Sequence, residues 1–223
     1  MGTDDLFHKR KALEEKDLRR KRSWRKPYDR VLIVCEGEKT EIRYFALLRA
    51  KLRLSSANIG IPDGQRGTDP MSIVQFAIDE FKKDKEYDRV YCVFDRDKHT
   101  TFNTAVNKVM DTRRTGVPIH AITSVPCFEV WLLLHYEHRP PAFCTTGNDS
   151  NCDPVVSRLK KHIPNYEKGN IDAVFEGLYN SRNVALKNAK SLEIFHETSG
   201  ADNPSTKVHE LVEYLMDLKK DKP

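Results

Sequence analysis

Two short acidic motifs stand where apolar runs of the sequence end. Glu36 follows the run VLIVC, and Asp95 and Asp97 close the run VYCVFDRD. Because residues i and i+2 of an extended backbone point to the same side, we expect the carboxylates of Asp95 and Asp97 to converge. Converging carboxylates repel one another unless a cation lies between them, and hard oxygen ligands suit Mg²⁺ or Mn²⁺. The sequence therefore predicts a divalent-metal site, with Glu36 as the third carboxylate and Gly37 permitting a sharp backbone turn.

The elements that would position these acids follow from the hydrophobic pattern. Apolar runs alternate with segments that carry apolar residues at helical spacing. This alternation is typical of βαβ units and a parallel sheet, and near-continuous apolar strands fit a sheet that is covered on both faces. Ligand sites in such sheets lie at the carboxyl ends of the strands. We expect strands at residues 30–35, 89–97 and 117–125, a short strand and a loop within 57–70, and helices at about 40–54, 71–85 and 101–114.

The second half of the chain is predicted to be mostly helical. Pro126 suits the first turn of a helix that carries the run WLLLH. Ser124 would either cap that helix or hydrogen-bond a site carboxylate, and Ser205 or Asn203 would cap the last helix. Further helices are expected at about 153–163, 170–193 and 204–220, the last with an apolar stripe of Val208, Leu211, Val212 and Leu215.

The positive charge of the chain is concentrated near its N-terminus. The net charge is +5, yet residues 8–26 alone carry ten Lys/Arg and three Asp/Glu, a net charge of +7. We therefore divide the chain into a basic, mobile arm at 1–27 and a nearly neutral domain at 28–223. Lys and Arg with an interleaved Trp24 predict salt-sensitive contacts with nucleic-acid phosphates, although a solubilising tail or an arm that docks on an acidic partner would look the same. The residues expected to touch phosphate are Arg19, Arg20, Lys21, Arg22, Arg25, Lys26 and, beyond the arm, Lys39.

Composition excludes several classes of protein. No apolar run approaches the roughly 20 residues of a membrane span, and the charged N-terminus lacks the apolar stretch of a secretory signal. Five cysteines, an odd number without a CxxC motif, argue against a disulfide framework and for the reducing cytoplasm.

The motifs taken together resemble a known family. A strand that ends in Glu-Gly, followed about 60 residues later by a strand that ends in Asp-x-Asp, resembles the TOPRIM domain of topoisomerases, DnaG-type primases and OLD-family nucleases. The stretches VLIVCEGEKTEIRYF, VYCVFDRDKH, SVPCFEVWLLLHY and NPSTKVHELVEYL are similar to the RloB family, small TOPRIM proteins of bacterial and archaeal defence loci. They run from residue 31 to residue 215. The resemblance implies an α/β fold with a three-layer, parallel-sheet, Rossmann-like TOPRIM core and a mostly helical C-terminal half.

The resemblance also implies roles for single residues. Glu36 would act as general acid/base or metal ligand, Asp95 and Asp97 as metal ligands, and Glu129 as a ligand of a second metal. Two metals can activate a water and steady the leaving oxygen of a phosphodiester. A basic residue near the metals would stabilise the transition state, and we take Lys187, or else Arg182, for this role.

Several acids and histidines have an alternative interpretation. Glu38 and Glu41 either contact metal or offset the dipole of the following helix in its first turn, and the resemblance favours Glu41 because it recurs in the family string. His99 would lie near phosphate or in solvent. A zinc site is the less favoured interpretation, because the ligand spacing fits no common finger; its ligands would be His135, His138, Cys144 and Cys152. For His135, a structural hydrogen bond is the preferred interpretation.

The resemblance implies a Mg²⁺- or Mn²⁺-dependent nuclease that cleaves DNA or RNA in anti-phage defence beside an AAA-type ATPase, and a homo-oligomer is one candidate assembly. A primase or a topoisomerase fragment would use the same acids, although the chain carries no recognisable zinc module or strand-passage tyrosine. A non-catalytic nucleic-acid-binding or sensor subunit is the other alternative. Acids that converge beside a basic groove would favour cleavage, whereas acids that splay apart would favour the binding role.

Overall fold

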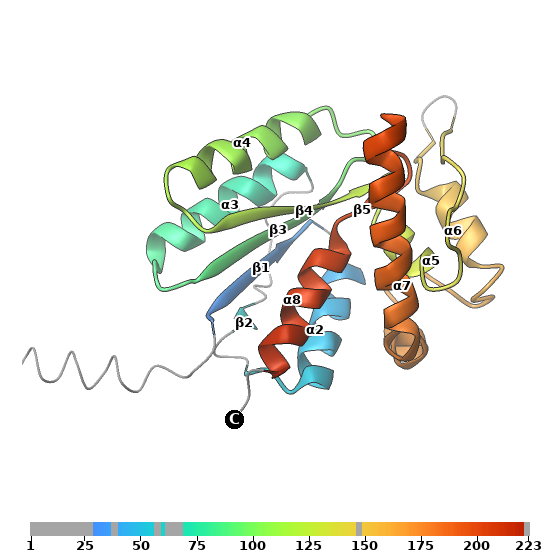
Figure 1. Cartoon of the computed structure of the whole chain (residues 1–223). Coiled ribbons are helices and arrows are strands. Elements are labelled where there is room, and N and C mark those ends of the chain that lie inside the picture. Colours follow the sequence, from blue (N-terminus) through green and yellow to red (C-terminus); the bar gives the residue numbers. More distant parts are fainter. Residues whose placement is uncertain (1–28, 37–39, 56–58, 61–68, 146–148, 221–223) are drawn as a thin grey trace, which may run out of the picture.

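The computed structural model describes residues 29–36, 40–55, 59–60, 69–145 and 149–220, and it confirms an α/β fold. Strands and helices alternate through the first half, and helices dominate the second half (Figure 1). The strands are β1 (Val31–Cys35), β2 (Ile59–Gly60), β3 (Arg89–Asp95), β4 (Ile119–Val125) and β5 (Ser205–Thr206). The helices are α2 (Thr40–Leu52), α3 (Pro70–Lys83), α4 (Phe102–Arg114), α5 (Glu129–Leu133), α6 (Asp153–Leu159), α7 (Asp172–Ser199) and α8 (Val208–Lys220).

The five strands form one sheet in the order β2-β1-β3-β4-β5. The first four strands are parallel, and β5 is antiparallel to β4. In the register of the sheet Cys35 pairs with Val93 and Asp95 pairs with Ser124. Because the strands are parallel, their carboxyl ends meet at one edge, where Glu36 and Asp95 both lie.

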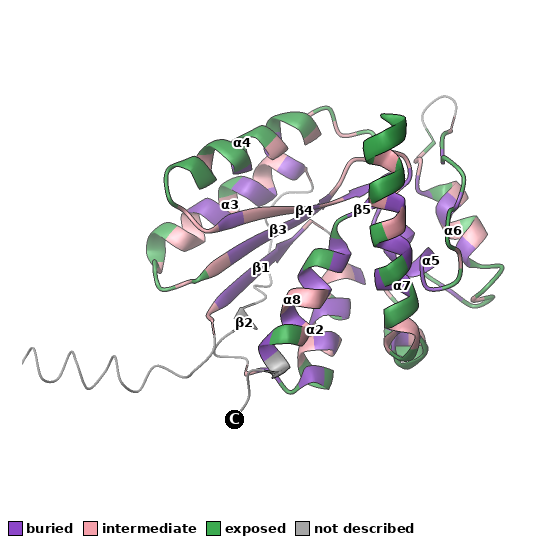
Figure 2. Ribbon diagram, in the orientation of Figure 1, coloured by how far each residue is buried: buried purple, intermediate pink, exposed green. Residues whose placement is uncertain are grey.

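Helices cover both faces of the sheet, which explains the continuous apolar strands. Along β1, Val31, Ile33 and Cys35 face a core shared with α2, α5, α7 and α8, while Leu32 and Val34 face a smaller core under α3 and α4. All five residues are buried (Figure 2). The two cores lie on opposite sides of the sheet and give the three-layer arrangement seen in Figure 1.

Local sequence signals explain where some helices begin and end. Asp69 accepts hydrogen bonds from the N–H groups of Met71 and Ser72, and Pro70 occupies the first turn of α3. Helix α7 runs to Ser199, six residues beyond the predicted end, and stops where Gly200 adopts a left-handed conformation with φ of 69°.

Two predicted helix starts are wrong. Helix α5 begins at Glu129 rather than at Pro126, because the backbone of residues 126–128 is used elsewhere: the Pro126 carbonyl accepts from Asp97, and the Phe128 N–H donates to a carboxylate. The last helix begins at Val208, because residues 205 and 206 pair with β4 as strand β5.

The predicted caps differ accordingly. The Thr206 hydroxyl accepts from the N–H of Val208, and Asn203 instead bonds to the backbone of Phe143. Ser124 neither caps α5 nor reaches a carboxylate, because its buried hydroxyl pairs with that of Thr206 at 3.1 Å. The predicted apolar stripe of α8 is confirmed, since all four of its residues are fully buried.

One disulfide corrects the expectation from the cysteine count. Cys127, just before α5, is joined to Cys152, just before α6, across 25 residues of sequence. Cys35, Cys92 and Cys144 are free thiols. An odd cysteine number excludes full pairing but says nothing against a single bridge, which is why the sequence did not predict it. No helix of the described ranges is both long and apolar enough to cross a membrane.

Candidate metal-binding site

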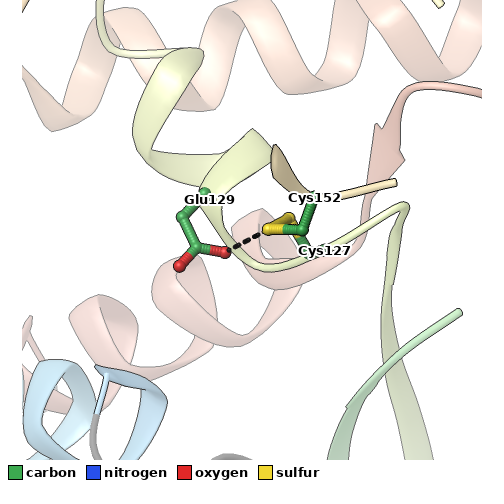
Figure 3. Close-up of side chains that lie close together, drawn as sticks. All are labelled: Cys127, Glu129 and Cys152. Atoms are coloured by element: carbon green, nitrogen blue, oxygen red, sulfur yellow. Dashed lines mark hydrogen bonds between the residues drawn. A yellow bond between two sulfur atoms is a disulfide. The ribbon is translucent and has the colours of Figure 1, made fainter. Parts of the chain in front are cut away.

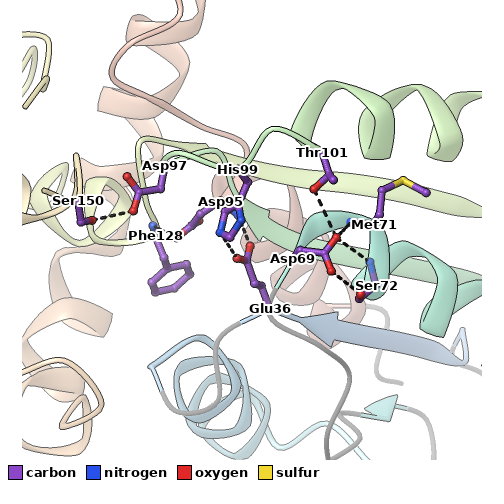
Figure 4. A network of polar contacts seen from close by, with 10 residues as sticks. All are labelled: Glu36, Asp69, Met71, Ser72, Asp95, Asp97, His99, Thr101, Phe128 and Ser150. Atoms are coloured by element: carbon purple, nitrogen blue, oxygen red, sulfur yellow. Dashed lines mark hydrogen bonds and ion pairs between the residues drawn. The ribbon is translucent and has the colours of Figure 1, made fainter. Parts of the chain in front are cut away.

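Glu36 and Asp95 lie side by side at the carboxyl edge of the sheet. Glu36 Oε2 accepts a hydrogen bond from the backbone N–H of Asp95 at 2.8 Å, and Asp95 Oδ2 accepts from the N–H of Phe128 at 2.9 Å. His99 Nε2 lies 2.8 Å from Glu36 Oε1 (Figure 4). The parallel pairing of β1 with β3 therefore brings together two of the acids that the sequence predicts.

Two further acids act on the same carboxylates. Burial raises the pKa of Glu36 and raises that of Asp95 well above its usual range, and the negative charges of Glu41, Glu129 and Glu36 raise the pKa of Asp95 further. Burial, followed by the charges of Glu129 and Glu36, raises the pKa of Glu41 to about 7. These four carboxylates, from the ends of β1 and β3 and the first turns of α2 and α5, thus act on one another electrostatically. We call Glu36, Glu41, Asp95 and Glu129 the acidic cluster.

Glu129 enters the acidic cluster from the first turn of α5. Its side chain is buried, and burial raises its pKa. Glu129 Oε1 accepts from the Tyr166 hydroxyl at 3.2 Å, and Oε2 lies 3.1 Å from Cys152 Sγ (Figure 3). The ligand atoms of Cys127, Glu129 and Cys152 lie within 4.8 Å of one another, so the disulfide borders the acidic cluster.

Asp97 does not join the acidic cluster. The extended conformation ends at Asp95, and Asp97 has a φ of 28°, so the expected alignment of the two aspartates is lost. Its carboxylate accepts from the Ser150 hydroxyl at 2.7 Å and from the N–H of Asn151 at 2.8 Å. In Figure 4 it points toward Ser150 and away from Glu36. The intervening Arg96 forms an ion pair with Asp202. The role of Asp97 as a metal ligand stays a prediction.

A lysine that the sequence did not single out acts electrostatically on the acidic cluster. The positive charge of Lys168 lowers the pKa of both Glu41 and Glu129, against the larger effect of burial. Lys168 lies in the loop before α7, and the next residue, Gly169, donates its N–H to Thr40 at the start of α2. No strand end or helix pattern marks this loop, so only the folded chain reveals it.

The predicted basic residues of α7 lie elsewhere. The exposed side chain of Lys187 makes no hydrogen bond or ion pair with the acidic cluster within the described part of the chain. The guanidinium of Arg182 stacks on the Tyr179 ring at 4.2 Å and donates to the Tyr179 carbonyl. The catalytic role of Lys187 remains a prediction, and Lys168 is the better-placed cation.

The alternative zinc ligands are not assembled into one site. His135 is buried with Nδ1 3.0 Å from the Trp131 carbonyl oxygen, as the structural interpretation predicts. His138 contacts Ser191, and Cys152 is bonded to Cys127. The remaining predicted contacts lie outside the described residues: Glu38, Lys39 and the arm residues Arg19, Arg20, Lys21, Arg22, Arg25 and Lys26.

Comparison with protein families adds one finding to this geometry. The model of the RloB-like protein family matches residues 31–215, which extends from β1 into α8 and contains every residue of the acidic cluster. The chain belongs to the RloB-like family. Comparisons of this RloB-like chain with curated proteins and with solved structures give no significant match.

The donor set of this RloB-like chain fits a hard divalent cation. Four carboxylates with raised pKa values act on one another electrostatically, and the positive charges that lower these pKa values come from Lys168 and, at Glu36, from His99. Burying several carboxylates with so little opposing charge is unfavourable, and a divalent ion offsets that cost. Oxygen-only ligands suit Mg²⁺ or Mn²⁺. Glu129, which is buried, and Asp95, whose pKa is raised well above its usual range, are the first candidates to bind it.

Proposed function

We propose that this RloB-like protein is a divalent-metal-dependent nuclease that hydrolyses phosphodiester bonds of DNA or RNA. The observation that carries the proposal is the acidic cluster at the carboxyl edge of a parallel sheet. An enzyme acting on nucleic acid at such an edge needs carboxylates to hold Mg²⁺ or Mn²⁺ against the phosphate. Carboxylates with raised pKa values are also typical of groups that take part in chemistry rather than surface solvation.

Each residue of the site has a distinct role in the proposed reaction. Asp95, oriented by the N–H of Phe128, and Glu129, oriented by Tyr166, would hold the divalent cation. A bound divalent ion supplies a Lewis acid and a water of lowered pKa. Glu36, in contact with His99, accepts the proton of the attacking water. Lys168 offsets the negative charge that develops on the phosphate.

The setting of the activity rests on the resemblance of the sequence motifs. A TOPRIM-type nuclease in prokaryotic anti-phage defence would act in the cytoplasm with an AAA-type ATPase that holds or triggers it. The basic arm supplies a sequence-blind affinity for phosphates. The roles of the arm and of the ATPase can each be tested separately from phosphodiester cleavage.

The decisive experiment incubates the purified chain with plasmid DNA and with structured RNA in Mn²⁺ or Mg²⁺. Wild type is compared with an Asp95→Ala, Asp97→Ala double variant and with an Asp111→Ala variant on the exposed face of α4 as the matched control. We expect metal-dependent cleavage by wild type and by the control but not by the double variant. Cleavage that survives the double substitution would refute the site.

A non-catalytic nucleic-acid-binding or sensor subunit is the second candidate. It is favoured by Asp97, whose carboxylate is held by Ser150 and Asn151 rather than by the acidic cluster. The same experiment separates the two functions, provided that binding is measured alongside cleavage. Binding of nucleic acid without cleavage of any substrate, even with the neighbouring ATPase added, would favour this second function.

A further inference from the structure

The Cys127–Cys152 disulfide lies between the two backbone segments that hold the aspartates of the Asp-x-Asp motif. Cys127 is flanked by Pro126, whose carbonyl accepts from the N–H of Asp97 at 2.9 Å, and by Phe128, whose N–H donates to Asp95 Oδ2 at 2.9 Å. Cys127 therefore lies between two residues, one of which contacts Asp97 and the other Asp95.

Cys152 stands in the same relation to Asp97 from the other side. The N–H of Cys152 donates to Ser150 Oγ at 3.1 Å, and the Ser150 hydroxyl donates to Asp97 Oδ2 at 2.7 Å. The N–H of Asn151 donates to Asp97 Oδ1 at 2.8 Å. Both oxygens of Asp97 are thus engaged by the segment that the disulfide ties to Cys127.

The bridge also decides which hydrogen bonds Glu129 can accept. In the disulfide Cys152 Sγ carries no hydrogen, so its 3.1 Å contact with Glu129 Oε2 cannot be donated by sulfur. In the reduced chain the thiol of Cys152 becomes a donor aimed at that oxygen. Reduction therefore has two opposing effects: the new thiol donor competes with a cation for Glu129 Oε2, and the loss of the covalent tie frees the segment that engages Asp97.

We propose that Cys127 and Cys152 are positioning residues of the acidic site, which in the disulfide hold Asp97 away from the acidic cluster and on reduction release it to join the cluster around a divalent cation. The inference rests on the proposed function, because it assumes a metal at the acidic cluster. Asp97 already follows Asp95 by two residues, so a change in its backbone conformation suffices to redirect its carboxylate.

The chemical step is thiol–disulfide exchange with a cellular dithiol or with glutathione. The reductant gives two electrons and two protons, the S–S bond of the chain breaks, two thiols form, and the reductant leaves as its own disulfide. Because Cys127 and Cys152 are 3% and 1% exposed, exchange requires a local opening of the segment around Cys152.

The test measures Mn²⁺ binding to the full chain by isothermal titration calorimetry, after reduction and after oxidation by glutathione disulfide, with the thiol state checked by mass spectrometry. We expect the reduced chain to bind Mn²⁺ about tenfold more tightly, as changes around metal ligands commonly produce. A Cys127→Ser, Cys152→Ser variant should bind equally in both buffers, whereas Cys144→Ser, which alters an exposed free thiol, should respond like wild type.

A second variant keeps the test informative if the double serine variant does not fold. Ser150→Ala removes one donor to Asp97, and it should raise the Mn²⁺ affinity of the oxidised chain toward that of the reduced chain. Equal affinities in the two redox states, tighter binding by the oxidised chain, or a cysteine pair that cannot be cycled in the folded protein would overturn the inference alone. The absence of Mn²⁺ binding in both states would overturn the proposed function as well.

Discussion

The carboxylate of Glu36 accepts the backbone N–H of Asp95 at 2.8 Å, and this bond joins the ends of two parallel strands through an acid. The bond holds Glu36 beside Asp95, where both side chains are partly buried and the pKa values of both carboxyls are raised. A charge placed in this way is unfavourable in the metal-free chain. The arrangement therefore links the stability of the fold to the chemistry of the site.

Neutralising Asp95 should separate stability from activity. We expect Asp95→Asn to raise the thermal unfolding temperature of the metal-free protein, because it removes a buried acid that three like charges oppose. The same variant should lose on the order of 100-fold or more in metal-dependent cleavage, since it removes a ligand. Calorimetry in EDTA and a plasmid-nicking assay measure the two effects. A variant that is both less stable and fully active would contradict the site.

The pH dependence of stability should carry the signature of Glu41. Its pKa is about 7 in the folded chain against an ordinary value of 4.5, so the folded state holds a proton that the unfolded state has lost. Glu41 should therefore make stability in EDTA fall as the pH rises from about 4.5 to about 7, by on the order of 1–3 kcal/mol. Denaturant unfolding at half-unit pH steps measures the decline.

Glu41→Gln is the matched variant for this measurement, because it keeps the shape of the side chain and removes the titration. It should flatten the decline between pH 4.5 and pH 7. Saturating Mg²⁺ should act in the same direction on wild type, since a bound cation favours the ionised acids. An unchanged decline in Glu41→Gln would assign the effect to the other acids of the cluster.

Lys168 and Lys187 offer a direct comparison of two candidate catalytic cations. Lys168 acts electrostatically on Glu41 and Glu129, whereas Lys187 projects from an exposed position of α7. We expect Lys168→Ala to lower cleavage by about 10- to 100-fold and Lys187→Ala to leave it within about twofold. Single-turnover cleavage rates at saturating Mn²⁺ make the comparison. The reverse order of effects would restore Lys187 as the catalytic cation.

Local sequence predicts those residues of the site that stand at the end of a strand. Glu36 and Asp95 were predictable because an apolar run followed by an acid places that acid at the carboxyl edge of a parallel sheet. Glu41 and Glu129 came from the resemblance of their motifs, and both carboxyls act electrostatically on Asp95. The fold class followed from the alternation of strands and helices, which depends on hydrophobic spacing alone.

The parts that failed depend on contacts between distant segments. Asp97 turns away because Ser150 and Asn151, more than 50 residues later, supply donors for its carboxylate. Lys168 reaches the site through a loop without a periodic pattern. Pro126 suits a helix start in isolation, yet the neighbouring backbone bonds to the aspartates instead. For Asp97 and Pro126, local propensity is overruled by a polar group that must find a partner.

A buried hydrogen bond joins α2 to α5. The indole N–H of Trp131 donates to the Tyr44 hydroxyl at 2.9 Å, and both side chains are buried. Tyr44→Phe leaves that N–H without a partner and should cost about 1–3 kcal/mol of stability. Because Glu41 lies on α2 and Glu129 on α5, Tyr44→Phe should also weaken Mn²⁺ binding. Denaturant unfolding and calorimetry test both effects, and Tyr136→Phe, at an exposed position, is the control.

The basic arm should govern affinity for nucleic acid without affecting metal binding. Residues 8–26 carry a net charge of +7 ahead of a nearly neutral domain. Deleting residues 1–26 should weaken binding to duplex DNA or RNA and reduce the slope of log K against log salt, because each lost phosphate contact removes about 0.7–0.9 from it. Fluorescence anisotropy at four salt concentrations measures the slope.

Two arm variants distinguish charge from specific recognition. Replacing the arm arginines by lysine keeps the charge, and it should preserve both affinity and slope if the contacts are electrostatic. Replacing them by glutamine should reproduce the deletion. Nucleic-acid binding that is unchanged by the deletion would point to an arm that docks on an acidic partner. A pull-down with the proposed AAA-type ATPase would then retain wild type but not the glutamine variant. Calorimetric Mn²⁺ affinity should be the same for all of these proteins, since the acidic cluster lies entirely within residues 36–129.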